Sequence, residues 1–160
     1  MQVKKMKILG KKEVESIERI VEKNYGAEID LKQFLVLETF EGKIWLVTKY
    51  LLNLDFSRLQ INSVGMNFGK LKRNDKINLT VEGSQIVGPK ATKNVCILNE
   101  ENAKKFMQGS DVKPDGDINC EYHNFSIIKF GEDILGSSLL NEEGIKNLLP
   151  KSRRIIRPML

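Results

Sequence analysis

The sequence predicts an α+β fold, with an N-terminal α/β domain that has an antiparallel sheet and a C-terminal domain that is mostly β. Three observations lead to this prediction: one amphipathic helix near the start, short strand-like runs joined by turn residues, and a Gly-Pro step at residues 88 and 89. A length of 160 residues suits one ordinary domain or two small ones. We therefore expect two domains, residues 1–88 and residues 89–160.

The first expected element is a helix over residues 11–24. Val14, Ile17 and Val21 recur at helical spacing and leave charged side chains on the opposite face. Gly26 follows as a stop signal, so the helix is expected to end there.

Strand-like runs follow this helix. Four of them are expected at residues 33–37, 43–48, 62–71 and 76–82. Phe40-Glu-Gly is the expected turn between the first two runs, and Arg73-Asn-Asp is the expected turn between the last two. A short helix is expected at residues 49–54.

The second half begins after Val87-Gly-Pro-Lys, where glycine and proline together interrupt strand pairing. A strand at residues 94–98 and a helix at residues 99–108 are expected next, with Asn99 as the helix N-cap and Gly109 as its end. Three more strands are then expected, at residues 120–122, 126–130 and 134–140. The last two are joined by a tight hairpin.

Composition excludes several classes of protein. The chain is 41% hydrophobic and 29% charged, which are values typical of globular domains and not of disordered ones. No apolar run reaches the roughly 18 residues that span a bilayer, and the apolar stretch at the start is too short for a signal peptide. We expect a cytoplasmic protein without membrane contact, or a nucleolar one if the source is eukaryotic.

Cysteine and histidine are too few for a structural zinc site. Such a site needs four ligands, and the chain holds only Cys96, Cys120 and His123. We expect no metal, and two free thiols that are mainly buried.

Neither a nucleotide-hydrolysing loop nor a catalytic centre is expected. Between Gly65 and Gly69 lie three residues instead of the four of a Walker loop, and Leu71 follows Lys70 where Ser or Thr is needed. The glycines are expected to mark a bulge or a close backbone approach. His123 belongs to no visible nucleophile arrangement. We expect no enzyme and no cofactor.

The C-terminal segment carries the main functional signal. The net charge is +5 and the pI is near 9.1. From residue 146 to the end there are five cations and no acidic side chain: Lys146, Lys151, Arg153, Arg154 and Arg157. Arginine contacts phosphate in a bidentate manner and stacks on bases, as single-stranded RNA requires. The interleaved Leu148, Leu149, Ile155 and Ile156 predict a segment packed on its domain. A merely solvated basic surface and a protein-docking face remain the alternatives.

The middle of the chain resembles the Nip-seven family of large-subunit ribosome biogenesis factors. The resemblance is most specific over residues 63–81, which contain Ser-x-Gly-x-x-Phe-Gly-Lys, and continues in Ile86-Val-Gly-Pro-Lys-Ala and Asn94-Val-Cys-Ile-Leu. Trp45-Leu-Val-Thr-Lys and Phe130-Gly-Glu-Asp-Ile-Leu-Gly also fit. The resemblance as a whole covers the chain from about residue 10 onward. The basic tail looks like the archaeal form, and is similar to the PUA-like tail of some RNA cytosine methyltransferases.

The resemblance implies a pre-PUA domain followed by a C-terminal PUA pseudo-barrel, the PUA domain being an RNA-binding module. It implies a non-catalytic role in pre-rRNA processing and large-subunit assembly, with uridine- or adenine/uridine-rich RNA and ribosome-assembly proteins as partners. Carried over to this sequence, the RNA contacts fall on Lys151, Arg153, Arg154 and Arg157.

Three further lysines are candidates on position alone: Lys146 to extend the basic surface, and Lys90 or Lys93 to guide RNA past the domain junction. The protein is expected to be a monomer. Two other functions remain open, a protein-interaction adaptor and an accessory subunit of an RNA cytosine methyltransferase.

Overall fold

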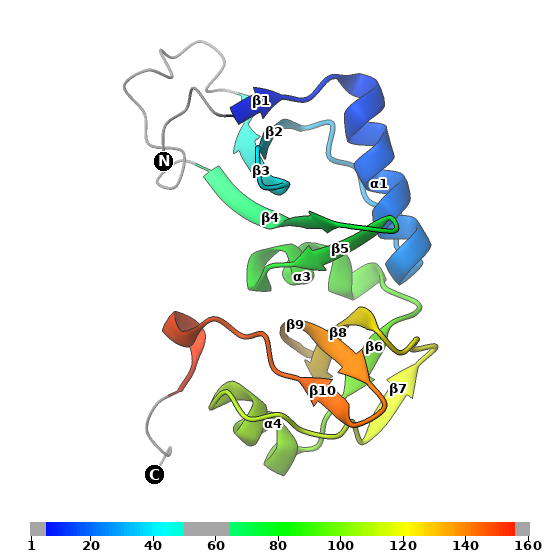
Figure 1. The fold of residues 1–160 in the computed structure, drawn as a ribbon, viewed down its shortest axis with the longest axis vertical. Coiled ribbons are helices and arrows are strands. Elements are labelled where there is room, and N and C mark those ends of the chain that lie inside the picture. The colour runs from blue at the N-terminus through cyan, green and yellow to red at the C-terminus, as the bar shows by residue number, and fades with distance from the viewer. Residues whose placement is uncertain (1–5, 50–64, 156–160) are drawn as a thin grey trace.

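Two five-stranded sheets, with helices packed around them, form an α+β fold in this computed structural model (Figure 1). The structure describes residues 6–49 and 65–155. The first sheet lies at one end of the molecule and the second at the other, and the chain passes from one to the other through helix α3. The predicted fold class is confirmed.

The first sheet is an antiparallel meander in the order β1-β2-β3-β4-β5. Its strands are β1 Met6–Ile8, β2 Phe34–Thr39, β3 Lys43–Thr48, β4 Gly65–Lys72 and β5 Lys76–Leu79. Each strand pairs with the next one along the chain, and short turns reverse the direction between β2 and β3 and between β4 and β5, whereas α1 lies between β1 and β2. The two hairpins predicted in this half are confirmed.

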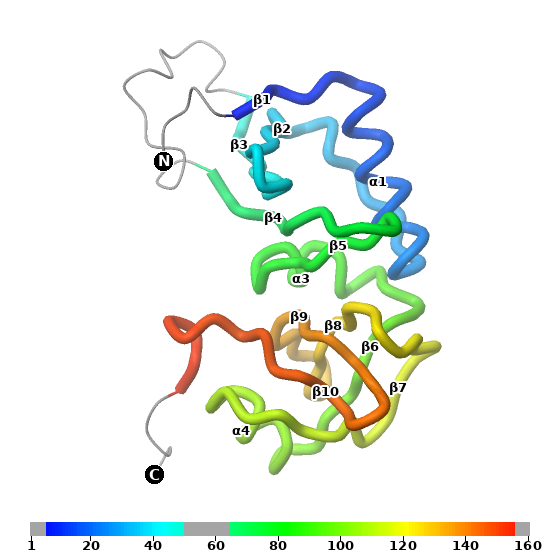
Figure 2. The backbone as a smooth tube through the Cα atoms, in the orientation of Figure 1, coloured from blue at the N-terminus to red at the C-terminus, as the bar shows by residue number. Residues whose placement is uncertain are grey.

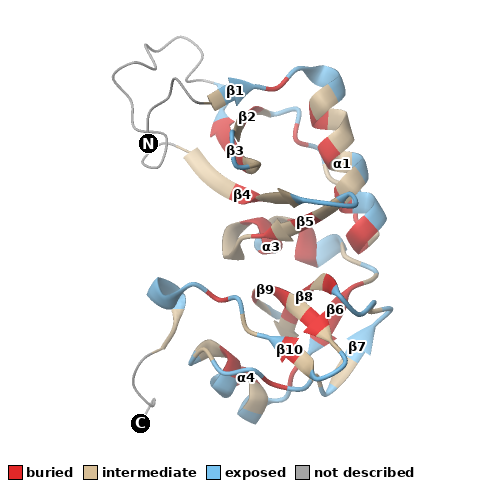
Figure 3. Ribbon diagram, viewed as in Figure 1, coloured by how far each residue is buried: buried red, intermediate tan, exposed pale blue. Residues whose placement is uncertain are grey.

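Helix α1 (Lys11–Tyr25) covers one face of this sheet. Val14, Ile17 and Val21 are buried, as the helical spacing predicts, and Gly26 ends the helix in the left-handed conformation with φ of 63°. Buried residues concentrate where the helix faces the strands (Figure 3). The helix is thereby fixed to β5, whose Ile77 carbonyl accepts a hydrogen bond from the Tyr25 hydroxyl at 2.9 Å.

A helix begins where the sequence predicted a continuing strand, so the expected strand over residues 76–82 is wrong beyond Leu79. Helix α3 (Val81–Val87) begins at Thr80, whose hydroxyl accepts a hydrogen bond from the backbone N–H of Gly83 at 2.9 Å. Gly83 also permits close packing, since a Cβ there would lie 1.9 Å from the Phe68 carbonyl oxygen. N-capping and a glycine contact therefore override the apolar alternation.

Gly69 has the structural role that the sequence favoured. The register of β3 and β4 shifts next to it, between Ile44 and Trp45. A Cβ on Gly69 would lie 2.9 Å from the Asn78 carbonyl oxygen. The helix expected at residues 49–54 falls, except for Lys49, outside the described residues, as does the start of the strand expected at residues 62–71.

The second sheet has the order β10-β9-β8-β6-β7, and β6 pairs with β8 in parallel. Its strands are β6 Val95–Ile97, β7 Gly116–Ile118, β8 Asn124–Phe130, β9 Asp133–Asn141 and β10 Gly144–Lys146. Helix α4 (Glu100–Met107) starts at the predicted N-cap, where the Asn99 side chain accepts from the Asn102 N–H at 2.8 Å. No strand forms at residues 120–122. The edge strand is β7, a few residues earlier.

The two halves share buried contacts. Val87, Val95 and Ile127 belong to the same buried cluster as α1 and the first sheet. The Asn94 side-chain amide donates to the Asn24 carbonyl at 2.5 Å, and the buried Asn124 amide donates to the Asn24 side chain at 3.3 Å. These contacts join β6 and β8 to the end of α1. The division between residues 88 and 89 stays a prediction.

Candidate RNA-binding surface

The C-terminal segment is anchored along its length. After β10 the backbone runs back toward the start of α3 (Figure 2). The Asn147 amide donates to the carbonyls of Phe106 and Ser110 at 2.8 and 2.9 Å, and the Ile155 N–H donates to the Met107 carbonyl at 2.8 Å. Leu149 is only 2% exposed. The prediction that this segment packs on its domain is confirmed for the part described.

Lys151 and Arg153 are exposed on η5, a short 3-10 helix over Lys151–Arg153. The Arg153 guanidinium forms an ion pair with Glu82 at the start of α3. Arg154 is half-buried, and its Nε donates to the Leu149 carbonyl at 3.0 Å. Its side chain lies on Gly109, where a Cβ would be 2.7 Å from the Arg154 Cδ. We call Lys151, Arg153 and Arg154 the tail cations.

The remaining predicted cations do not gather there. Lys146 ends β10 and borders a shallow depression that also contains Asp111 and Glu143. Lys90 lies in η4 (Gly88–Lys90), beyond the far end of α3 from Glu82, and Lys93 lies 4.0 Å from the Glu121 carboxylate. Arg157 lies outside the described residues. The tail cations lie together in sequence on η5 and the residue after it, with Arg153 at Glu82 and Arg154 at Gly109, and the three lysines lie apart from them.

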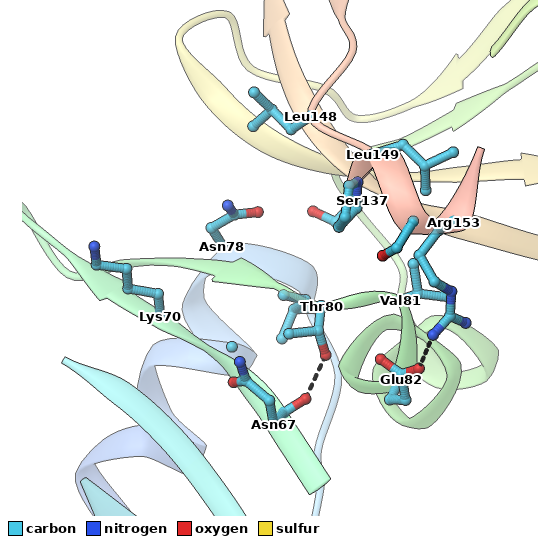
Figure 4. Close-up of a pocket in the computed structure, with 14 residues that line it drawn as sticks. Asn67, Lys70, Asn78, Thr80, Val81, Glu82, Ser137, Leu148, Leu149 and Arg153 are labelled. Atoms are coloured by element: carbon cyan, nitrogen blue, oxygen red, sulfur yellow. Dashed lines mark hydrogen bonds and ion pairs between the residues drawn. The ribbon is translucent and has the colours of Figure 1, made fainter. Parts of the chain in front are cut away.

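A pocket of about 320 Å³ opens beside the tail. In Figure 4, Asn67, Lys70 and Asn78 of the first sheet lie on one side of it, and Ser137 of β9 and Leu149 of the tail lie on the other. Arg153 and its partner Glu82 complete the lining. Because both sheets and the tail contribute residues, no local stretch of sequence contains this site.

Apart from Arg153, the pocket side chains were not predicted from the sequence, although a signal for two of them exists. Asparagine is depleted in strands, yet Asn67 lies in β4 and Asn78 in the neighbouring β5. Thr80, by contrast, is accounted for within the fold, since its hydroxyl donates to the Asn67 backbone carbonyl at 2.5 Å. Two strand asparagines near one edge indicate a polar site.

The two cysteines form a pair of free thiols. Their Sγ atoms lie 3.7 Å apart, with Cys96 buried and Cys120 half-buried. The hydrogen bond between the thiols lowers the pKa of Cys120 to about 7, and the same bond, with burial, raises the pKa of Cys96. Among residues 6–49 and 65–155, no group of three His, Cys, Asp or Glu side chains is arranged to hold a metal ion.

His123 lies apart from the pocket. Its Nε2 lies 2.7 Å from a Glu142 carboxylate oxygen, and its backbone carbonyl accepts from the Lys76 ammonium at 2.7 Å. The pKa of Glu142 is lowered, chiefly by a backbone hydrogen bond and next by the His123 hydrogen bond.

Across the described ranges, no helix is long and apolar enough to cross a membrane.

Comparison with known proteins finds similarities that include the second half of the chain. Residues 93–155 match the family described as the PUA domain of methyltransferase RsmF. A crystal structure of a PUA domain from Aeropyrum pernix K1, in complex with tartrate, superposes with a TM-score of 0.52 at 12% identity, covering 95% of this chain and 85% of that one. No curated protein matches.

These matches show a PUA-type fold, and a PUA domain indicates RNA binding. The matched residues contain the second sheet, α4 and the tail cations.

Proposed function

We propose that this chain is a non-catalytic factor of ribosome biogenesis, of the Nip-seven type, that holds single-stranded RNA on its tail cations. The observation that carries the RNA contact is the anchored position of η5: Lys151 and Arg153 are exposed on a packed segment of the PUA-type domain. Cations on a fixed backbone lose less freedom on binding phosphate than cations on a loose tail.

Arg153 is available to phosphate despite its ion pair. Both partners are partly exposed, at 46% for Arg153 and 42% for Glu82, and exposed pairs contribute about 0–1 kcal/mol. A phosphate that offers bidentate contacts therefore competes with the Glu82 carboxylate. Arg154 contributes charge but has one N–H committed to the tail backbone.

The ribosomal role rests on the family resemblance of residues 63–81 and on the PUA-type fold that the resemblance implied. In this role the bound RNA is pre-rRNA. The first sheet, together with α1, contacts the assembly proteins. The domains proposed are residues 1–88 and residues 89–160.

A second function is equally compatible with the family match. Residues 93–155 match a family that is described as the PUA domain of a methyltransferase, RsmF. An accessory subunit that brings an RNA cytosine methyltransferase to its target would use the same tail cations. It would also form a stable complex with an adenosylmethionine-dependent enzyme.

The test of RNA binding is fluorescence anisotropy with a labelled, uridine-rich single strand at two salt concentrations. We expect micromolar or tighter binding that weakens as salt rises, because phosphate contacts release counterions. No binding even at low salt would instead support the protein-interaction adaptor. Co-purification with a methyltransferase from cells would favour the accessory subunit, and co-purification with pre-ribosomal particles the biogenesis factor.

A further inference from the structure

Buried polar atoms without partners gather in the pocket beside the tail. Within the described part of the chain, four buried side-chain nitrogen or oxygen atoms have no hydrogen-bond partner, and three of them belong to pocket residues: Asn67 Oδ1, Asn78 Oδ1 and Ser137 Oγ. More than nine in ten buried polar groups in proteins are paired. Such atoms around one pocket point to a ligand that supplies missing partners.

The internal contacts of the fold explain Ser137 but not the two asparagines. Ser137 has a partner within the fold: its hydroxyl lies near the Tyr25 hydroxyl and partly offsets the rise in the Tyr25 pKa that burial causes, and the Tyr25 oxygen is able to accept because Tyr25 donates its own proton to the Ile77 carbonyl. Thr80, in the same lining, has all its contacts within the protein. The unpaired state is thus left to the Oδ1 atoms of Asn67 and Asn78.

The amide groups determine which ligand fits. The terminal torsion of asparagine is soft and two-fold, and no bond to either Oδ1 opposes rotation. Rotation about this torsion would turn either the oxygen or the N–H groups of Asn67 and Asn78 into the pocket that they line. An amide that offers one donor and one acceptor complements the amino group and adjacent ring nitrogen of adenine.

The rest of the pocket suits a nucleotide. Val81 and Leu148 supply apolar surface for the faces of a ring, and Lys70 and Arg153 supply positive charge for a phosphate. A volume of about 320 Å³ lies at the lower end of the range for small-ligand sites. Single-stranded RNA presents such unstacked bases to its binding proteins.

We propose that this pocket holds one unstacked adenine nucleotide of the bound RNA, read by the side-chain amides of Asn67 and Asn78. The inference rests on the proposed RNA binding by the tail cations. Arg153 belongs to both sites, so it links the phosphate contacts on η5 to the base in the pocket.

The experiment compares three labelled ten-nucleotide strands by fluorescence anisotropy with the full chain. One strand is all uridine, the second carries a single central adenosine, and the third carries inosine there, which replaces the amino group by a carbonyl. We expect the adenosine strand to bind about tenfold more tightly than the other two, equivalent to about 1.4 kcal/mol.

In the Asn67→Ala/Asn78→Ala variant, the ratio of affinities for the adenosine and uridine strands should fall below about twofold. Gln33→Ala, which removes an exposed amide from the same half of the chain, should keep the tenfold ratio. Asn78→Leu is the second variant, because it removes an unpaired oxygen and fills the pocket. Thermal unfolding of each variant checks that the fold is intact.

The outcomes separate the two proposals. If the wild type binds all three strands equally, the pocket holds only water and the adenine inference is overturned, while RNA binding stands. If folded Asn67→Ala/Asn78→Ala or Asn78→Leu keeps the adenosine preference, the amides are not the reading groups and the inference is also overturned. If no strand binds, the proposed function fails and the adenine inference falls with it.

Discussion

Replacing Lys151 and Arg153 together by alanine should halve the salt dependence of RNA binding. Each phosphate contact to a single strand contributes a slope of about −0.7 in a plot of log affinity against log salt concentration. If the tail cations and Arg157 make four contacts, the wild-type slope is about −2.8. The double variant loses two contacts, which leaves a slope of about −1.4.

These slopes convert into a measurable difference in affinity. Between about 50 and 200 mM salt, the wild type should lose about 50-fold in affinity and the Lys151→Ala/Arg153→Ala variant about sevenfold. Fluorescence anisotropy with a uridine-rich strand at four salt concentrations measures both slopes. Arg154 is kept in this test, because its Nε hydrogen bond to Leu149 helps to hold the tail in place.

The matched control removes the same amount of charge elsewhere. Lys90 and Lys146 are exposed and lie away from η5, so the Lys90→Ala/Lys146→Ala variant should keep the wild-type slope. An unchanged slope for the Lys151→Ala/Arg153→Ala variant would refute the assignment of η5 as the phosphate site. A flattened slope for the control would move that site to the junction or to the end of β10.

Three further perturbations test the fold and the site. Gly83→Ala should lower the free energy of unfolding by about 2 kcal/mol, since about 3 kcal/mol of overpacking against the Phe68 carbonyl exceeds about 1 kcal/mol of gained helix propensity. Calorimetry should then show a melting temperature lower by roughly 4–8 °C, and an unchanged value would contradict the close contact. Alkylation of Cys120 by iodoacetamide should reach half its maximal rate near pH 7. The reason is that the thiolate is the reactive form and the pKa of Cys120 lies at about 7. A midpoint near pH 8.5, the ordinary pKa of a free thiol, would contradict the thiol pair. Glu82→Gln should tighten RNA binding about two- to fivefold by releasing Arg153, as measured by anisotropy, and weaker binding would show that the pair positions Arg153 instead.

The predicted elements that the structure confirms have strong local causes. The helix ending at Gly26 follows from apolar spacing and a glycine stop, and α4 follows from the Asn99 cap. The packing of Leu149 follows from apolar residues placed between cations. Each of these signals lies within one turn or one strand of the element that it specifies, so sequence alone was enough to predict it.

The wrong predictions fall where a local signal competed with another one. Alternation of apolar residues favoured a strand through Val81, but the Thr80 cap and the contact of Gly83 with β4 turn the chain into α3. Residues 120–122 were expected to form a strand, yet Cys120 packs beside Cys96 while the edge of the sheet is formed by β7.

The sequence by itself determined the fold class, the terminal position of the basic segment and the expectation of RNA as a partner, because composition and periodicity report on local structure and charge. Only the tertiary structure decided which side chains the tail cations contact and that Asn67, Asn78 and Ser137 line one pocket. Asn78 and Ser137 meet there because β5 and β9, about 60 residues apart in sequence, pack against each other in the folded protein. Such a long-range juxtaposition depends on side-chain packing between distant segments, which leaves no local pattern to read.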